Sequence, residues 1–175
     1  MKKILVSALV MFAWVGVRAQ VTSVYTDLID TKCKTIELNE NEGGWYKGLC
    51  PGIAGYKLEL IEGDLRQTIN IIDPKGTTHE LHFWKLTGAF SAVGEKAEWR
   101  MKGKRPIALI VRLNVSEHQD DGTSRNKGYL VVAKITPQAI CVTHFLAPTR
   151  SHNFEARRAA DKSASRPCRF ESTPD

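Results

Sequence analysis

The chain has no apolar run long enough to cross a bilayer as a helix. The longest, Ile4–Val17, has fourteen residues, whereas a membrane-spanning helix needs about 20. Lys2 and Lys3 precede this run, and Val17-Arg18-Ala19 follows it with small residues at the two positions that a signal peptidase reads. This layout is typical of a secretory signal peptide. We therefore expect residues 1–19 to be removed on export, leaving no transmembrane segment.

Cysteine is scarce and widely spaced. There are four cysteines, and the closest two are seventeen residues apart, whereas zinc ligands usually come two to four residues apart. An even number in an exported chain favours two disulfides, for which three connectivities exist. We favour pairing of neighbours, Cys33 with Cys50 and Cys141 with Cys168, because the second bridge would tie the end of a predicted helix to the last predicted strand.

The chain also lacks the motifs of common metal and nucleophilic sites. His79 and His82 are three apart on a predicted strand, which places them on opposite faces. The segment 118–121 lacks the alternating acids of a calcium loop. No Gly-x-Ser-x-Gly elbow is present, and Gly43-Gly44 lacks the flanks of a phosphate-binding loop. We expect no metal and no cofactor, and we favour a protein that is not an enzyme.

Positive charge is smaller than the whole sequence suggests. The chain has a net charge of +6, but Lys2, Lys3 and Arg18 leave with the signal peptide, so 22 basic and 19 acidic residues remain, a net of +3. These charges are interspersed, as on an ordinary soluble surface. We expect no nucleic-acid binding, and we interpret the basic clusters at 102–105 and 150–158 as solvated faces. Mild attraction to an anionic envelope surface stays open.

Alternation of apolar and polar residues indicates strands over much of the chain. Segments 55–61 and 65–72 flank a turn and predict a hairpin. A third strand, 78–84, follows the type I turn signal Asp73-Pro74-Lys75-Gly76. Further strands are expected at 97–102, 107–115, 128–136 and 139–146, with 86–96 and 116–127 as loops. Segment 107–115 begins apolar on both faces, which indicates a strand covered on both sides.

One helix is expected, near the C-terminus. Ala156, Ala160 and Ala164 recur at fourfold spacing within 153–164, and Pro167 follows. The predicted fold class is α+β and β-rich: one domain, residues 20–175, whose antiparallel meander is rolled into a sandwich or partial barrel with a C-terminal helix and two disulfides.

Two aromatic and charged clusters are the candidate binding residues. His82 and Trp84 share one face of the predicted strand, while Leu81 and Phe83 point inward. Glu98 and Arg100 lie on the face opposite to Trp99. Tryptophan and arginine are enriched in interaction hot spots, so His82, Trp84, Glu98, Trp99 and Arg100 form our candidate site. A buried Trp99 beside a surface ion pair is the alternative.

The chain resembles a group of small, uncharacterised exported proteins of Gram-negative bacteria. The resemblance covers most of residues 20–175, and its most specific parts are Glu98-Trp99-Arg100 and the alanine- and arginine-rich helix. It implies a periplasmic or secreted location and supplies no activity or catalytic residue. The segments that carry it are Cys50-Pro51-Gly52, Gly55-Tyr56, Gly63-Asp64-Leu65-Arg66, His82-Phe83-Trp84, 94–100, 106–112, Ile140-Cys141-Val142, Asn153, 156–161 and Cys168.

Two classes of function follow as expectations. The favoured one is a non-enzymatic envelope protein that binds an envelope component or a protein partner. The alternatives are a small periplasmic hydrolase with a site assembled from distant residues, and a protein similar to the exported inhibitors of lysozyme. Inhibitors of that kind tend to be acidic, and a net charge of +3 counts against one here.

Overall fold

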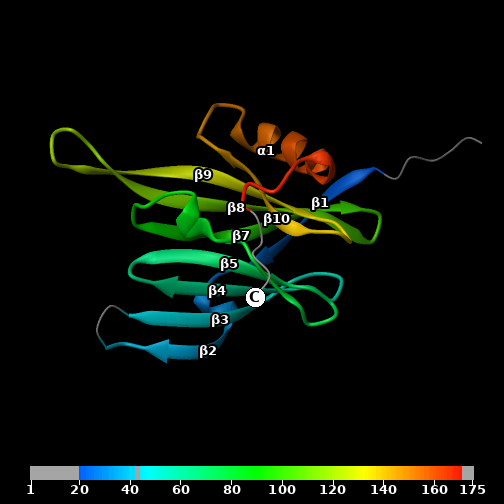
Figure 1. Cartoon of the computed structure of the whole chain (residues 1–175), viewed down its shortest axis with the longest axis horizontal. Coiled ribbons are helices and arrows are strands. Elements are labelled where there is room, and N and C mark those ends of the chain that lie inside the picture. The colour runs from blue at the N-terminus through cyan, green and yellow to red at the C-terminus, as the bar shows by residue number, and fades with distance from the viewer. Residues whose placement is uncertain (1–19, 42–43, 171–175) are drawn as a thin grey trace, which may run out of the picture.

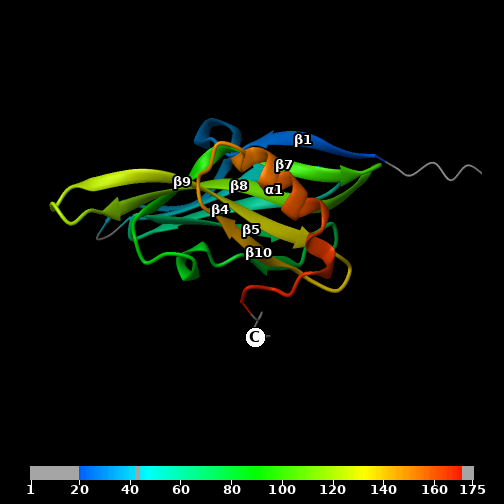
Figure 2. The same ribbon diagram turned by 90° about the horizontal axis from the view of Figure 1, so that it is seen from above.

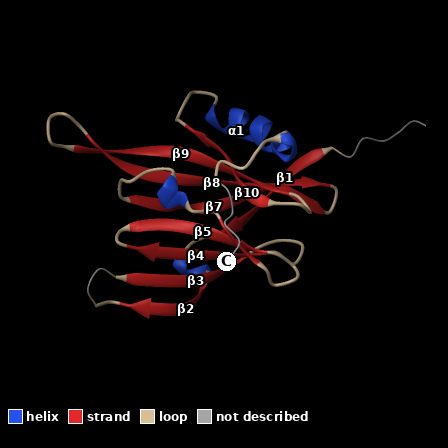
Figure 3. Cartoon of the chain, viewed as in Figure 1, coloured by secondary structure: helices blue, strands red, loops and turns tan. Residues whose placement is uncertain are grey.

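The structure, a computed structural model, describes residues 20–41 and 44–170. Strands dominate it, and one α-helix lies near the C-terminus (Figures 1 and 3). The expected β-rich α+β class is therefore confirmed. The expected signal peptide, residues 1–19, lies outside the described residues, and so does the end of the expected domain.

Ten strands, one α-helix and three short 3-10 helices make up the described chain. The strands are β1 (Val21–Asp27), β2 (Lys34–Asn39), β3 (Trp45–Pro51), β4 (Lys57–Gly63), β5 (Arg66–Ile72), β6 (Thr78–Glu80), β7 (Ser91–Lys102), β8 (Arg105–His118), β9 (Ser124–Ile135) and β10 (Ile140–Leu146). The helices are α1 (His152–Asp161), η1 (Asp30–Lys32), η2 (Phe83–Lys85) and η3 (Ser163–Ser165).

The strands form one sheet that does not close into a barrel. Its order is β10-β9-β8-β7-β5-β4-β3-β2, with β1 paired to β7 and β6 paired to β5. Every pairing between described strands is antiparallel except that of β5 with β7, which consists of the single parallel pair Arg66–Ser91. This narrow junction divides the sheet into two halves, β2 to β6 and β1 with β7 to β10.

The two halves fold toward each other and share the main core. Leu58 and Ile69 from one half belong to the same buried cluster as Trp99 and Leu109 from the other. Trp99 is fully buried, and its Nε1 donates a hydrogen bond to Thr26 Oγ1 at 2.9 Å. The predicted inward direction of Leu81 and Phe83 is confirmed, because these side chains are at most 2% exposed. The burial of Trp99 matches the alternative given for it and not its place among the candidate binding residues.

A second, smaller core lies between α1 and the outer face of β8 and β9. Ala156 and Ala160 of α1 pack on Ala108, Ile110 and Val132, and Figure 2 shows the helix running over these strands. The alanines keep the helix surface flat, so α1 lies close to the sheet. Strand β8 is thus covered on both faces, as its doubly apolar sequence indicated.

Both predicted disulfides are present. Cys33 pairs with Cys50, and Cys141 pairs with Cys168. The second bridge ties the segment after η3 to β10, where the backbone N–H of Arg169 also donates to the carbonyl of Val142 at 2.7 Å. The four cysteines of the sequence are therefore all oxidised.

Three local predictions were wrong. The strand expected at 78–84 ends at Glu80, because His82 adopts a left-handed backbone conformation that begins η2. The loop expected at 116–127 is mostly a hairpin, because the polar ends of β8 and β9 pair as far as His118 and Ser124. The loop expected at 86–96 ends early, since β7 begins at Ser91. Strands β1 to β3 were not predicted.

No helix within the described part of the chain is long and apolar enough to span a membrane.

Candidate functional site

The five candidate residues do not form one site. Trp99 lies in the core, whereas Glu98 and Arg100 project from the opposite face of β7 toward α1. His82 and Trp84 lie in or beside η2, in the other half of the sheet. The geometry therefore contains an α1-facing cluster and a separate histidine cluster.

Glu98 and Arg100 are held in a network that joins the sheet to α1. Arg100 Nε and Nη2 donate to Asp161 Oδ1 and Oδ2 at 2.7 and 2.9 Å. Arg157 Nε donates to Glu98 Oε1 at 2.6 Å, and this hydrogen bond raises the pKa of Arg157 above its ordinary value. Ser23 of β1 bridges the two, since its hydroxyl donates to Glu98 at 2.5 Å and accepts a hydrogen bond from Arg100. The network clamps α1 to β7 and β1.

His82 lies in a cavity of about 880 Å³ that His79 also lines. The sequence predicted that these imidazoles point to opposite faces, and this was wrong, because β6 ends between them. Each imidazole faces its own carboxylate: His79 Nε2 lies 3.4 Å from Asp73 Oδ2, and His82 Nδ1 lies 3.3 Å from Glu80 Oε2. Within residues 20–41 and 44–170, no group of three metal-ligating side chains gathers.

Trp84 does not line this cavity, although its ring centroid lies 6.0 Å from that of His82. Its side chain is 40% exposed. In the same cavity the carboxylate of Asp73 accepts hydrogen bonds from the backbone N–H groups of Thr77 and Lys75. The hydrogen bond from Thr77 is the largest cause of a lowered pKa of Asp73.

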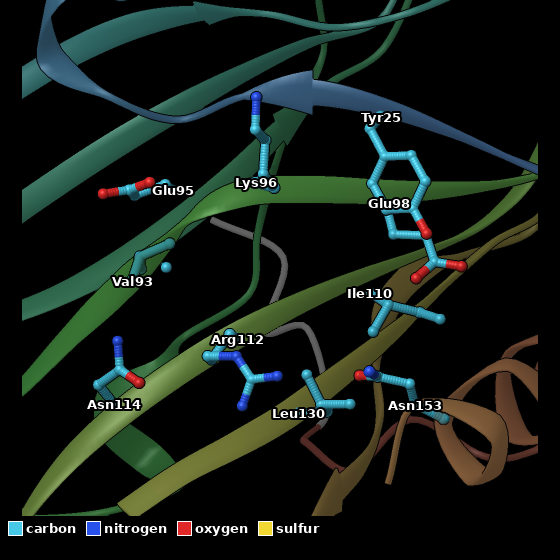
Figure 4. Close-up of a pocket in the computed structure, with 12 residues that line it drawn as sticks. Tyr25, Val93, Glu95, Lys96, Glu98, Ile110, Arg112, Asn114, Leu130 and Asn153 are labelled. Carbon is cyan, nitrogen blue, oxygen red and sulfur yellow. The ribbon is translucent and has the colours of Figure 1, made fainter. Parts of the chain in front are cut away.

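A second cavity, of about 550 Å³, opens between β7, β8, β9 and the N-terminal end of α1 (Figure 4). We call it the Arg112 groove, after the arginine on its floor. Ile110 and Leu130 form its apolar part, while Asn114 and Asn153 bring side-chain amides. In Figure 4 the guanidinium of Arg112 points along the groove toward Leu130 and Asn153.

A bulge in β7 makes room for this groove. The pairing of β7 with β8 shifts between Val93–Leu113 and Ala97–Val111, so three residues of β7 stand opposite Arg112 alone. Bulges bend a strand and are frequent beside functional sites. Because of the extra length of β7, Gly94 to Lys96, Arg112 has no partner in register on that strand, whereas Leu130 of β9 stands opposite it.

Two glycines lie against the Arg112 side chain. A Cβ added at Gly94 would lie 2.9 Å from Arg112 Cβ, and one added at Gly128 would lie 2.7 Å from Arg112 Nη1. Neither glycine has a positive φ, so their backbone conformation does not require glycine. At Gly94 the close approach of Arg112 Cβ requires glycine, because that atom is fixed to the β8 backbone, whereas at Gly128 the neighbour is the movable end of the arginine side chain.

Arg112 has no carboxylate partner among the residues that the structure describes. Its hydrogen bond, from Nη1 to the carbonyl of Gly128, is long at 3.5 Å. Glu98, the nearby acid, is engaged by Arg157, and the Glu95 carboxylate points away from Arg112 in Figure 4. Arg112, a half-buried residue, therefore has only this one long hydrogen bond within the described part of the chain.

Alternation in the sequence places Arg112 on one strand face with Ala108, Ile110 and Asn114, but the sequence analysis gave it no role. The usable signal was a single cation among Ala108, Ile110 and Asn114, together with glycines inside two strands. The bulge that joins these features depends on strand register, which the sequence pattern did not reveal.

Comparisons with protein families, with curated proteins and with solved structures give no match for this chain. The geometry of the Arg112 groove therefore carries the functional argument.

Proposed function

We propose that this is an exported binding protein, periplasmic or secreted, that holds an anionic group of an envelope component or protein partner in the Arg112 groove. The signal-peptide pattern of residues 1–19 and the two disulfides support export, because disulfides persist in oxidising compartments. The resemblance to exported Gram-negative proteins supports the same location. Neither nucleic acid nor a cofactor is part of the proposal.

The half-buried, unpaired guanidinium of Arg112 is the observation that carries it. Removing a cation from water without a partner costs free energy, and the chain adds two glycines and a bulge around it. Such features weaken a strand. A costly arrangement of this kind is expected where a ligand supplies the missing partner, since binding sites trade stability for function.

The groove fits a carboxylate or phosphate beside a small apolar group. A guanidinium offers a planar fork of donors that matches both anions. Asn114 and Asn153 add amide donors, and Ile110 and Leu130 provide an apolar wall. The ligand is therefore expected to carry its negative charge next to a hydrocarbon part rather than at the end of a long polar chain.

The test is a titration of the purified, oxidised protein followed by nuclear magnetic resonance. The probes are acetate, inorganic phosphate and N-acetyl-leucine, which carries a carboxylate beside an apolar side chain. We expect saturable shifts of the Arg112 Nε–Hε signal and of the Asn114 and Asn153 amides, with N-acetyl-leucine binding more tightly than acetate. Arg112→Gln should weaken binding by at least about 10-fold, the effect of losing a charge-assisted hydrogen bond.

Lys104→Gln is the matched control, because it removes one positive charge in the exposed turn between β7 and β8. It should bind the probes as the wild type does. Equal binding by Arg112→Gln and the wild type would reject the groove as the site. If the protein hydrolyses an ester of N-acetyl-leucine, the alternative of a small hydrolase would be favoured.

A further inference from the structure

A second charged surface lies on the solvent side of α1, away from the face that packs on the sheet. Arg158 and Lys162 project from the solvent side of the helix, and Arg166 follows η3. These three line a shallow depression of about 330 Å³ together with His144 of β10. Arg169, beside the Cys141–Cys168 bridge, adds a further exposed cation. We call Arg158, Lys162, Arg166 and Arg169 the basic face.

The basic face is not neutralised by the protein. None of its four cations forms an ion pair with a residue in the described part of the chain. Glu155 also lines the depression and keeps its negative charge while it accepts hydrogen bonds from Thr149 and Ser151, so it offsets one of the four cations. Asp161 is engaged by Arg100. The positive potential is therefore left open to solvent.

His144 reports this potential. Burial lowers its pKa, and the charges of Arg166 and Arg169 lower it further. Both effects disfavour a proton on the imidazole, but only the smaller one, from Arg166 and Arg169, comes from the positive charge of the surface.

An exposed aromatic ring adjoins the basic face. Phe154 is 61% exposed, and the guanidinium of Arg158 lies 5.7 Å from its ring centroid. The alanines of α1 face the sheet, so Phe154 and Arg158 share the outer side of the helix. An apolar ring among arginine and lysine is typical of helices that lie at the interface of an anionic bilayer.

We propose that the basic face and Phe154 dock this protein on an anionic lipid surface, with the four cations at the phosphate headgroups. Guanidinium forks match phosphate oxygens, and the Phe154 ring is placed to enter the interface. The inference does not depend on the Arg112 groove. Because Asn153 and Ala156 of the same helix line that groove, docking would keep the groove close to the membrane surface.

The experiment measures co-sedimentation of the purified, oxidised protein with vesicles. Vesicles of phosphatidylglycerol and phosphatidylethanolamine should bind the protein, whereas phosphatidylcholine vesicles should not. The variant R158Q/K162Q should bind about 30-fold more weakly, which corresponds to about 1 kcal/mol for each cation near an anionic surface. Phe154→Ser should also weaken vesicle binding. The salt dependence of vesicle binding should stay unchanged, because this substitution removes no charge.

The control variant K102Q/K104Q removes the same charge at the turn between β7 and β8. It should weaken binding by less than about 3-fold, because charges beyond a Debye length are screened. Equal losses in both double variants would overturn the proposal, as would absence of binding to the anionic vesicles. Release by inorganic phosphate at constant ionic strength would also overturn it, since the face would then bind free anions.

Arg112→Gln separates this proposal from the preceding one. Arg112→Gln should bind vesicles as the wild type does. R158Q/K162Q should bind N-acetyl-leucine as the wild type does. Loss of vesicle binding in Arg112→Gln would place the lipid contact in the groove and overturn the assignment to the basic face.

Discussion

Arg100 and Asp161 form a two-pronged ion pair between β7 and α1, with Nε and Nη2 of the arginine 2.7 and 2.9 Å from the two carboxylate oxygens. Arg112, on the adjacent strand β8, lines the groove beside this helix and has no carboxylate partner among the described residues. One arginine therefore joins the sheet to the helix, and the other is the residue that we propose binds a ligand.

A double-mutant cycle should show that the Arg100–Asp161 pair is structural. The Arg100 side chain is 8% exposed, and without Asp161 its largely buried charge keeps only the longer ionic contact with Glu98 Oε1 at 3.8 Å. We expect Arg100→Met and Asp161→Asn each to destabilise the protein, with a coupling free energy of about 1–3 kcal/mol. Urea denaturation of the four proteins measures it, and additive effects would contradict the account.

Gly94→Ala should destabilise the protein by about 1–3 kcal/mol, the usual cost of overpacking. The new Cβ would meet Arg112 Cβ at 2.9 Å, and that atom cannot move without the β8 backbone. Gly88→Ala is the control, because nothing lies within 4 Å of its Cβ position. Thermal unfolding of both variants tests this, and equal melting temperatures would show that Arg112 yields the space at no cost.

Stability should fall at acidic pH partly through Asp73. Its folded-state pKa is lowered, chiefly by the hydrogen bond from the Thr77 backbone. The ionised carboxylate therefore contributes stability above its ordinary pKa of 3.8, and that contribution is lost as pH falls through the lower folded value. Asp73→Asn should show a weaker loss of stability below about pH 4. Denaturation midpoints between pH 2 and 7 measure this, and parallel curves would contradict it.

Export should leave a chain that begins at Gln20 and contains no free thiol. The disulfides Cys33–Cys50 and Cys141–Cys168 occupy all four cysteines. Mass spectrometry of protein from the periplasm or the medium gives the N-terminus, and thiol titration of unfolded, unreduced material counts free thiols. An intact Met1 with reactive cysteines would refute export. In the chain-entropy account, loss of each bridge costs about 3 kcal/mol.

The fold class could be predicted because its main signals are local. Strand β8 alternates and its first half is apolar on both faces, and the alanines of α1 recur at helical spacing. The order of the last predicted strand and the helix favoured the pairing of neighbouring cysteines. Strands β1 to β3 escaped prediction because few of their residues are buried, and the two that are in β3, Gly48 and Cys50, are not large apolar side chains. All six residues of β2 are exposed, so no apolar alternation marks it.

The hairpin at the end of β8 and β9 was missed for a different reason. Its residues are polar, and they are held by cross-strand contacts such as Lys127 Nζ to Glu117 Oε2 at 2.6 Å and the hydrogen bond from Tyr129 to Glu117. A polar segment of that composition usually indicates a loop.

The candidate residues could be predicted only in part. Glu98 and Arg100 were placed on the correct face, but their partners Arg157 and Asp161 come from a helix some sixty positions away. The Arg112 groove depends on a register shift in β7, which no pattern within β7 indicates. Glycines within strands were the usable signal, because glycine weakens a strand and often marks a bulge or a close approach of neighbouring atoms.

The free energy of unfolding of Arg112→Met, beside that of Arg100→Met, tests the central claim most directly. Methionine keeps the apolar length of the side chain and removes the charge. We predict that Arg112→Met is as stable as the wild type or more stable, because a half-buried cation without a partner is removed, while Arg100→Met loses roughly 2–3 kcal/mol. A similar loss in both variants would show that Arg112 is held for the fold and would contradict its assignment to ligand binding.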